Sequence, residues 1–261
     1  KLLFDNISVV YLGDSTDPNL DFESGENGEK VFNWNMYERR ENPNKPGEFE
    51  EGSFGAYTAV KAEGASKDGS AAVHISKPQT GDVQLYLQSI MLEVSGNTDY
   101  LLSYDAMAQG NKKGSLQICV RQYKNAYGDN VKDEAEAFKW VTDAYEYGSF
   151  DWKNCGGAFK TAKDARFVKI WLVSNTSDAM DMYIDNVALT KTESIDDPNL
   201  DFEYTAGGKP LNWSYVTSDG IASISADKSV YYRGSSSLHI EKQYSRINYT
   251  TATMAKRINV S

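Results

Sequence analysis

An internal repeat constrains this chain more than any other feature of its sequence. The seven residues Asp-Pro-Asn-Leu-Asp-Phe-Glu at positions 17–23 return unchanged at positions 197–203. Shorter matches join segment 4–7 to 184–187, Asn33-Trp34 to Asn212-Trp213, and segment 69–75 to 234–240. Because self-similarity in a fixed order indicates repeated structural units, the sequence predicts a tandem array of modules.

The order of these matches predicts where each module begins and ends. Segment 17–23 opens the complete copy, and segment 184–187 closes it. We therefore interpret residues 1–14 as the closing strand of a preceding module, 15–194 as one complete module and 195–261 as the first third of a following module. The opening Lys1-Leu2-Leu3-Phe4 is typical of the middle of a strand, so we expect this sequence to be part of a longer protein.

Alternation of apolar and polar residues predicts β-strands across the complete copy. In segment 83–88, and at positions 116, 118 and 120 of segment 116–123, every second residue is apolar, which is the period of a strand with one buried face. Segments 100–106 and 167–173 are also predicted strands, whereas 131–147 is ambiguous between helix and strand. Many short strands with polar outer faces predict an all-β protein, an antiparallel β-sandwich or jelly roll.

Charge and composition exclude several partners. The chain has 27 basic and 37 acidic side chains and a net charge of −10, so we expect no nucleic-acid partner, because phosphate binding needs clustered lysine and arginine. No apolar run is longer than four residues, as in residues 9–12, which is too short for membrane insertion. Two cysteines, Cys119 and Cys155, allow at most one disulfide and exclude a disulfide scaffold.

Several short motifs follow one another in an order known from one protein family. Segment 19–23 is similar to an N-G-x-F-E opening with Leu20 in place of glycine, and Asn33-Trp34 stands where the family carries Gly-Trp. Segments 69–75, 96–103 and 183–187 are similar to its G-x-x-S-L-x-V, G-T-x-Y-x-x-S and Y-x-D-D-V stretches, and Trp152, Phe159 and 165–168 follow its W…F…A-x-x-V run. Segment 125–151 is longer than in the family. The complete copy resembles the calcium-binding jelly-roll carbohydrate-binding modules of families four, nine, sixteen and twenty-two.

The resemblance implies a fold, a cofactor and a function. It implies a two-sheet β-sandwich with a structural calcium ion, and non-catalytic binding of plant or cell-wall polysaccharide. It further implies an extracellular or cell-surface protein in which neighbouring modules of the same chain raise the affinity by repetition. A glycoside hydrolase or another catalytic domain is then expected elsewhere in the parent protein.

Three carboxylates of the complete copy are candidate calcium ligands: Asp21, Glu23 and Asp185. Positions i and i+2 of a strand share a face, so Asp21 and Glu23 are expected to point the same way, with Asp185 beside them on the closing strand. Carboxylates brought together repel one another unless a hard cation with oxygen ligands neutralises them. The alternative is that they are solvated acids on an edge strand. The equivalent acids of the partial copies are Asp5, Asp201 and Glu203.

Outward-facing side chains of three predicted strands indicate a sugar-binding groove. A sugar ring has an apolar face and a rim of hydroxyl groups, which aromatic rings beside amide and charged groups satisfy. The candidates are Gln84, Tyr86, Gln88, Gln117, Arg121, Tyr123, Lys169 and Trp171, with Trp140 as a wall. Tyrosine is also common on exposed strands because of its β-propensity, and Trp171 equally suits a second hydrophobic layer.

Two other functions compete with polysaccharide binding. The modules are alternatively structural or adhesive repeats of a bacterial cell-surface protein without sugar affinity, in which case the outward aromatic residues would be scattered. A jelly-roll polysaccharide lyase is the second alternative, and it requires His74, Arg121 and a tyrosine together in a basic cleft. The sequence contains no catalytic fingerprint of the GxSxG, Walker A, HExxH or GxGxxG type, so we predict no catalysis by this chain.

Overall fold

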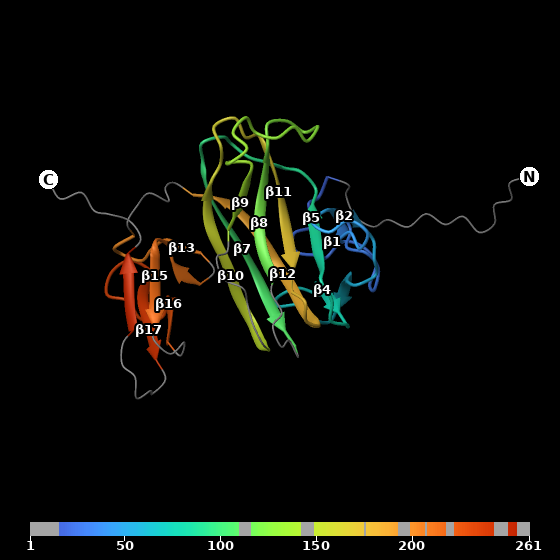
Figure 1. Ribbon diagram of the computed structural model, residues 1–261. Helices are drawn as coiled ribbons and strands as arrows, with labels where there is room; N and C mark the ends of the chain where they lie inside the picture. Colours follow the sequence, from blue (N-terminus) through green and yellow to red (C-terminus); the bar gives the residue numbers. More distant parts are fainter. Residues whose placement is uncertain are drawn as a thin grey trace, which may run out of the picture.

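The computed structural model describes residues 16–109, 116–141, 149–174, 176–192, 199–206, 208–217, 222–242 and 250–254 (Figure 1). Every helix or strand assigned within these ranges is a β-strand, and every strand pair is antiparallel. The all-β antiparallel prediction is therefore confirmed. No helix in this part of the chain has the length and apolar character needed to cross a membrane.

Two sheets make up the main body of the molecule. The larger sheet has the strand order β2-β1-β5-β11-β8-β9, with β6 also paired to β11. Its strands are β1 (Trp34–Glu41), β2 (Phe49–Gly52), β5 (Val83–Ser89), β6 (Leu92–Glu93), β8 (Leu116–Tyr123), β9 (Phe138–Trp140) and β11 (Phe167–Ser174). The smaller sheet has the order β10-β7-β12-β4-β3. Its strands are β3 (Thr58–Glu63), β4 (Ala71–Lys77), β7 (Asp99–Ala108), β10 (Phe150–Lys160) and β12 (Met180–Lys191).

The hydrophobic core lies between these two sheets. The larger sheet contributes the inward residues of its central strands, among them Leu85, Ile118 and Leu172, which are completely buried. From the smaller sheet Ile75 and Ile184 are equally buried. The inward positions predicted for segments 83–88 and 116–123 are therefore confirmed, and the ambiguous segment 131–147 contains the short strand β9 in its described part.

The opening segment lies against the closing strand β12, but it is not a strand. The Val187 amide donates to the Leu20 carbonyl at 2.9 Å, and Phe22 is buried in the same core as Ile184. Residues 20–21 form a turn, and Phe22 has a φ of 58°. The expectation that Asp21 and Glu23 share the face of a strand is therefore wrong.

A side-chain cap is the reason for this turn. The Asn19 side chain accepts a hydrogen bond from the Ser24 amide at 2.9 Å and donates to the Phe32 carbonyl at 2.9 Å. The Trp34 indole donates to the Asn19 carbonyl at 3.1 Å. Asparagine tolerates the left-handed backbone that this arrangement needs, with a φ of 48° at Asn19.

The repeated segment 199–213 folds in the same way. Asn199 accepts from the Tyr204 amide and donates to the Leu211 carbonyl, and the Trp213 indole donates to the Asn199 carbonyl at 3.0 Å. Phe202 has a φ of 61°, so residues 199–203 adopt the same turn as the identical residues 19–23. The described strands after it are β13 (Thr205–Ala206), β14 (Lys209–Pro210), β15 (Trp213–Thr217), β16 (Ala222–Asp227), β17 (Ser237–Lys242) and β18 (Thr250–Met254). The predicted segment 1–14, including Asp5, lies outside the described residues, and the module boundaries stay a prediction.

Candidate functional site

The outer face of the larger sheet carries rows of polar and aromatic side chains. Strands β5, β11 and β8 are neighbours (Figure 1), so the outward residues predicted on three separate segments share one face. Pairing brings Trp171 opposite both Gln88 and Cys119, and Lys169 opposite Arg121. Along the strands the candidates occupy successive rows. These are Phe167 and Tyr123; Lys169 and Arg121; Gln88, Trp171 and Trp140; Tyr86 and Gln117; and Gln84.

A groove of about 330 Å³ is hollowed into this face. Its lining residues are Tyr37, Arg39, Glu51, Tyr86, Arg121, Phe138, Trp140 and Trp171. Four of the predicted sugar-binding residues, Tyr86, Arg121, Trp140 and Trp171, therefore come together in one concave site. The other five predicted residues lie on the same face of the sheet but do not line the groove: Gln84, Gln88, Gln117, Tyr123 and Lys169.

The aromatic rings of the groove form one connected cluster. Tyr37 stacks on Tyr86 with ring centroids 4.9 Å apart and planes inclined by 5°. Trp171 meets Tyr86 edge-on at 5.8 Å and Phe138 at 5.7 Å, and Trp140 packs edge-on against Phe138 at 5.1 Å. These offset and edge-to-face arrangements are the favoured ones for aromatic pairs, so the rings hold one another in fixed orientations.

Trp171 is the floor of the groove rather than an open platform. Its side chain packs with Cys119 and Val173 under Tyr86 and Phe138, and only 6% of its surface is exposed. The second hydrophobic layer considered for Trp171 is therefore present. Trp140, on the edge strand β9, is 47% exposed and offers an accessible ring face.

Hydrogen bonds and charges fix the polar groups around these rings. The Tyr86 hydroxyl donates to Gln84 Oε1 at 3.0 Å. Burial raises the pKa of Tyr37 to about 12, with the nearby Glu51 carboxylate adding to the effect. Tyr37 is therefore a neutral hydroxyl at physiological pH. The Trp171 indole N–H has no hydrogen-bond acceptor among the described residues, although buried polar groups are normally paired.

Four lining residues were missed by the sequence reasoning: Tyr37, Arg39, Glu51 and Phe138. Strand β1 places Tyr37 and Arg39 outward, but the buried position between them is a glutamate, Glu38, which interrupts the apolar alternation. Glu38 is fully buried because its carboxylate accepts backbone N–H groups of the following loop, from Gly55 at 2.8 Å and Tyr57 at 2.6 Å. The alternation of Phe138 and Trp140 was visible, but the ambiguity of its segment hid their pairing with β8.

The predicted calcium ligands come together only in part. The Glu23 carboxylate accepts hydrogen bonds from the Ser70 amide at 2.7 Å, the Ala71 amide at 3.0 Å and the Ser70 hydroxyl. Burial raises its pKa, but these hydrogen bonds and the Lys61 charge outweigh that effect and hold the pKa of Glu23 below its usual value. Asp21 is exposed, and among the described residues it accepts a hydrogen bond only from the Glu23 amide, at 3.3 Å.

Asp185 is the buried member of this acid group. Its carboxylate accepts from the Lys67 amide at 2.8 Å and the Asn186 amide at 2.7 Å. Burial raises the pKa of Asp185, and the charge of Glu23 raises it further, so these two acids lie close enough to repel. Among the described residues no group of three or more histidine, cysteine or acidic side chains is arranged to hold a metal ion. Of the three predicted ligands, the structure therefore brings Glu23 and Asp185 near each other and leaves Asp21 exposed.

The equivalent acid of the following segment makes the same contacts. Glu203 accepts hydrogen bonds from the Ser235 amide at 2.8 Å, the Ser236 amide at 3.1 Å and the Ser235 hydroxyl at 2.5 Å. Asp201 bonds to the Glu203 amide at 3.4 Å, as Asp21 does to Glu23.

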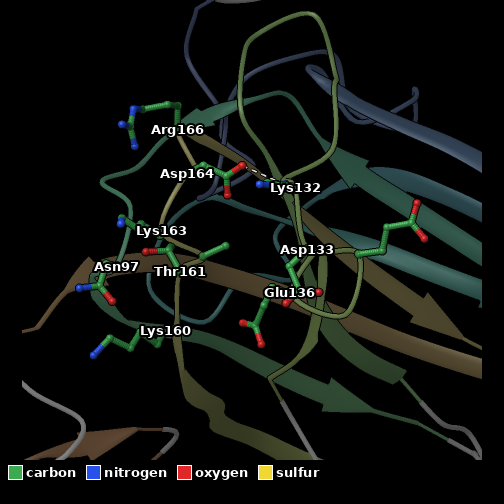
Figure 2. Close-up of a pocket in the computed structure, with 11 residues that line it drawn as sticks. Asn97, Lys132, Asp133, Glu136, Lys160, Thr161, Lys163, Asp164 and Arg166 are labelled. Atoms are coloured by element: carbon green, nitrogen blue, oxygen red, sulfur yellow. Dashed lines mark hydrogen bonds between the residues drawn. The ribbon is translucent and has the colours of Figure 1, made fainter.

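A second, larger cavity of about 930 Å³ opens at one end of the sandwich. Figure 2 shows the basic side chains of Lys160, Lys163 and Arg166 on one side and the acidic Asp133 and Glu136 across from them. Asp164 accepts a hydrogen bond from the Lys132 amide at 2.9 Å, which ties the loop after β8 to the loop before β11. None of the described residues that line this cavity is aromatic.

The arrangement required for a lyase is not formed. His74 lies on β4 of the smaller sheet, where it stacks on Tyr183 at 4.5 Å and bonds to Asp181 at 2.7 Å. Arg121 lies on β8 of the larger sheet. The two cysteines are also on different sheets, and both are free thiols.

Comparison with known proteins finds similarity only among solved structures. No protein-family model matches the sequence, and no curated protein matches it. The fold is similar to the enzymatically active domain of tailspike protein 4 from bacteriophage CBA120 (TM-score 0.46, 14% identity, 67% of this chain and 22% of that one). It is also similar to the CBM22-1 xylan-binding domain of Xyn10C from Paenibacillus barcinonensis (0.42, 13%, 67% and 92%). A further similar structure is TmCBM61 in complex with β-1,4-galactotriose (0.39, 18%, 67% and 96%). These similarities assign no ligand to this chain.

Proposed function

We propose that the chain is a non-catalytic carbohydrate-binding module that holds a polysaccharide in the groove of the larger sheet. One observation carries the proposal: five aromatic rings, from β1, β5, β9 and β11, meet in one solvent-open groove rather than being scattered over the surface. Scattered rings were the expectation for a purely structural or adhesive repeat, so the observed cluster favours binding.

The chemistry of the groove suits a sugar ring. Trp140 and Tyr86 present apolar ring faces for the C–H surface of a sugar, and Trp171 below them excludes water. Arg39, Glu51 and Arg121 stand around the rings as donors and acceptors for hydroxyl groups. Because the rings are locked against one another, little side-chain freedom is lost on binding.

Affinity electrophoresis against β-glucan, xylan, mannan and pectin, followed by calorimetry on the best ligand, tests this function. Trp140→Ala and Tyr86→Ala are each expected to weaken binding about tenfold or more, the equivalent of about 1.4 kcal/mol. Tyr127→Ala is the matched control, since Tyr127 is 95% exposed and does not line the groove. Unchanged affinity in both groove variants, with melting temperatures near that of the parent chain, would refute the groove assignment.

We also propose that Glu23 and Asp185 hold a structural calcium ion between the opening segment and β12. The support is the burial of Asp185 beside Glu23 without a salt bridge to either acid among the described residues. Calcium prefers such oxygen ligands, and an ion that binds only the folded state raises its stability. Calcium is therefore expected to raise the melting temperature of the parent chain, and EDTA to reverse the rise. A melting temperature indifferent to both reagents would exclude the site.

A further inference from the structure

We propose that the groove selects acidic polysaccharides, in which uronic acid carboxylates bind Arg121 and Lys169; this inference rests on the proposed function. Lys169 and Arg121 are direct pairing partners on the adjacent strands β11 and β8, and both project from the outer face of the sheet. Like charges in directly opposite positions of a sheet repel each other. An anion placed between the two cations relieves this repulsion.

The described residues supply no such anion in a salt bridge to either cation. Some other cations of this acid-rich chain lie beside carboxylates, such as Arg40 with Glu50 at 2.7 Å and Lys139 with Glu136 at 2.6 Å. Among the described residues no salt bridge is formed by Arg121 or Lys169. Burial lowers the pKa of Lys169, and the positive charge of Arg121 lowers it further, which agrees with the missing counter-charge.

Arg121 is held in a position that suits a carboxylate. Its guanidinium lies 5.5 Å from the centre of the Trp171 ring and 5.7 Å from that of Tyr123, and one of its nitrogens donates to Asn130 Oδ1 at 3.3 Å. An arginine carries five N–H donors in a planar fork, so several remain for a ligand. Fork-shaped pairing with a carboxylate is the strongest hydrogen bonding that arginine forms.

The cations also lie at the right place relative to the aromatic floor. Arg121 and Lys169 are two residues along their strands from Cys119 and Trp171, which is about 7 Å. A polysaccharide whose ring rests against the Trp140 and Tyr86 faces can therefore direct the carboxylate of an adjoining ring toward the cation pair. Arg39, at the opposite end of the groove over the Phe49 ring at 4.3 Å, adds a third positive charge against the single carboxylate of Glu51.

Matched polymers that differ only in their carboxyl groups test this inference. Glucuronoxylan and polygalacturonate are each compared with the same polymer after chemical reduction of the carboxyl groups. The parent chain is expected to bind at least one acidic polymer about tenfold more tightly than its reduced form. The difference is expected to shrink as the NaCl concentration rises, because salt screens exposed charges.

Charge-neutralising variants locate the effect. Arg121→Gln with Lys169→Gln is expected to abolish the preference, so that the acidic polymer and its reduced form bind the variant with equal affinity. Lys163→Gln, an exposed cation of the end cavity, is the control and is expected to keep the preference. Equal binding of acidic and reduced polymers by the parent chain would overturn the inference but leave the proposed function standing. If Lys163→Gln lost the preference for the acidic polymer as fully as the double variant, the preference would reflect non-specific charge attraction and the inference would be wrong. No binding to any acidic or neutral polymer would overturn the proposed function as well.

Discussion

Replacing Gly69 by alanine is expected to destabilise the module through a single acid, Glu23. A Cβ atom at position 69 would lie 2.1 Å from Glu23 Oε1, far inside any real contact distance. The backbone of Gly69 is not in the left-handed region, so alanine adds no backbone strain. The whole cost therefore comes from displacing the Glu23 carboxylate from the Ser70 and Ala71 amides and the Ser70 hydroxyl.

The size of the effect follows from those three hydrogen bonds. A hydrogen bond to a charged group contributes about 1.5–3 kcal/mol when buried, and partial exposure of Glu23 reduces this to about 1 kcal/mol each. Against a loss of about 3 kcal/mol stands a gain of up to about 1 kcal/mol, because alanine restricts the unfolded chain. Gly69→Ala is therefore expected to cost about 2 kcal/mol, or roughly 4–8 °C in melting temperature for a module of this size.

A double-mutant cycle measured by urea unfolding at pH 7 in EDTA checks the mechanism. Glu23→Ala is expected to cost a similar amount, and the double variant little more than either single one, since both changes break the same bonds. Glu26→Ala, at an exposed acid of the same loop, is the control and is expected to be neutral. Additive costs of the two single variants would refute the reasoning.

The pH dependence gives an independent check on Glu23. Its folded-state pKa is lowered, so its contribution is present above the unfolded pKa of about 4.3 and is lost as the pH falls through the folded value. The difference in the free energy of unfolding between the parent chain and Glu23→Gln is therefore expected to decrease below about pH 4.

Three further outcomes are expected. Burial raises the pKa of Tyr57 to about 12, so above pH 10 the unfolded state loses the hydroxyl proton first and the free energy of unfolding falls by up to about 1.4 kcal/mol per pH unit. In urea unfolding between pH 10 and 12, Tyr57→Phe is therefore expected to show a shallower fall than the parent chain. Equal falls in the two proteins would contradict this. Glu38→Gln is expected to lower the free energy of unfolding by about 2–3 kcal/mol, because the buried carboxylate accepts hydrogen bonds from backbone amides of the loop after β2. An unchanged free energy of unfolding in urea would count against that role. Burial raises the pKa of the Cys119 thiol, which makes the thiol unreactive in the folded protein. In a Cys155→Ser variant, a thiol reagent is therefore expected to modify Cys119 only as fast as the chain unfolds. Immediate labelling of the native protein would show that the thiol is accessible.

Local pattern was enough to predict the class of fold. The repeat predicted that segments 17–23 and 197–203 have the same structure, but not that this structure is a turn. Alternation in 83–88 and 116–123 determined which side chains face inward, because a strand places successive residues on opposite faces. Identity between 17–23 and 197–203 predicted equal structures, and Asn19 and Asn199 make the same caps. The pattern failed where a polar residue is buried at Glu38, and where the asparagine cap bends 20–23 out of the strand on which Asp21 was placed.

What the sequence determined by itself is therefore the face on which each residue lies, since that depends only on the two-residue period of the backbone. What only the tertiary structure decided is which strands are neighbours. The pairing of β1 with β5 and of β8 with β9 brings Tyr37, Phe138 and Trp140 to the predicted residues. Strand order depends on how two whole sheets bury their inner faces against each other, and no short segment of sequence carries that information.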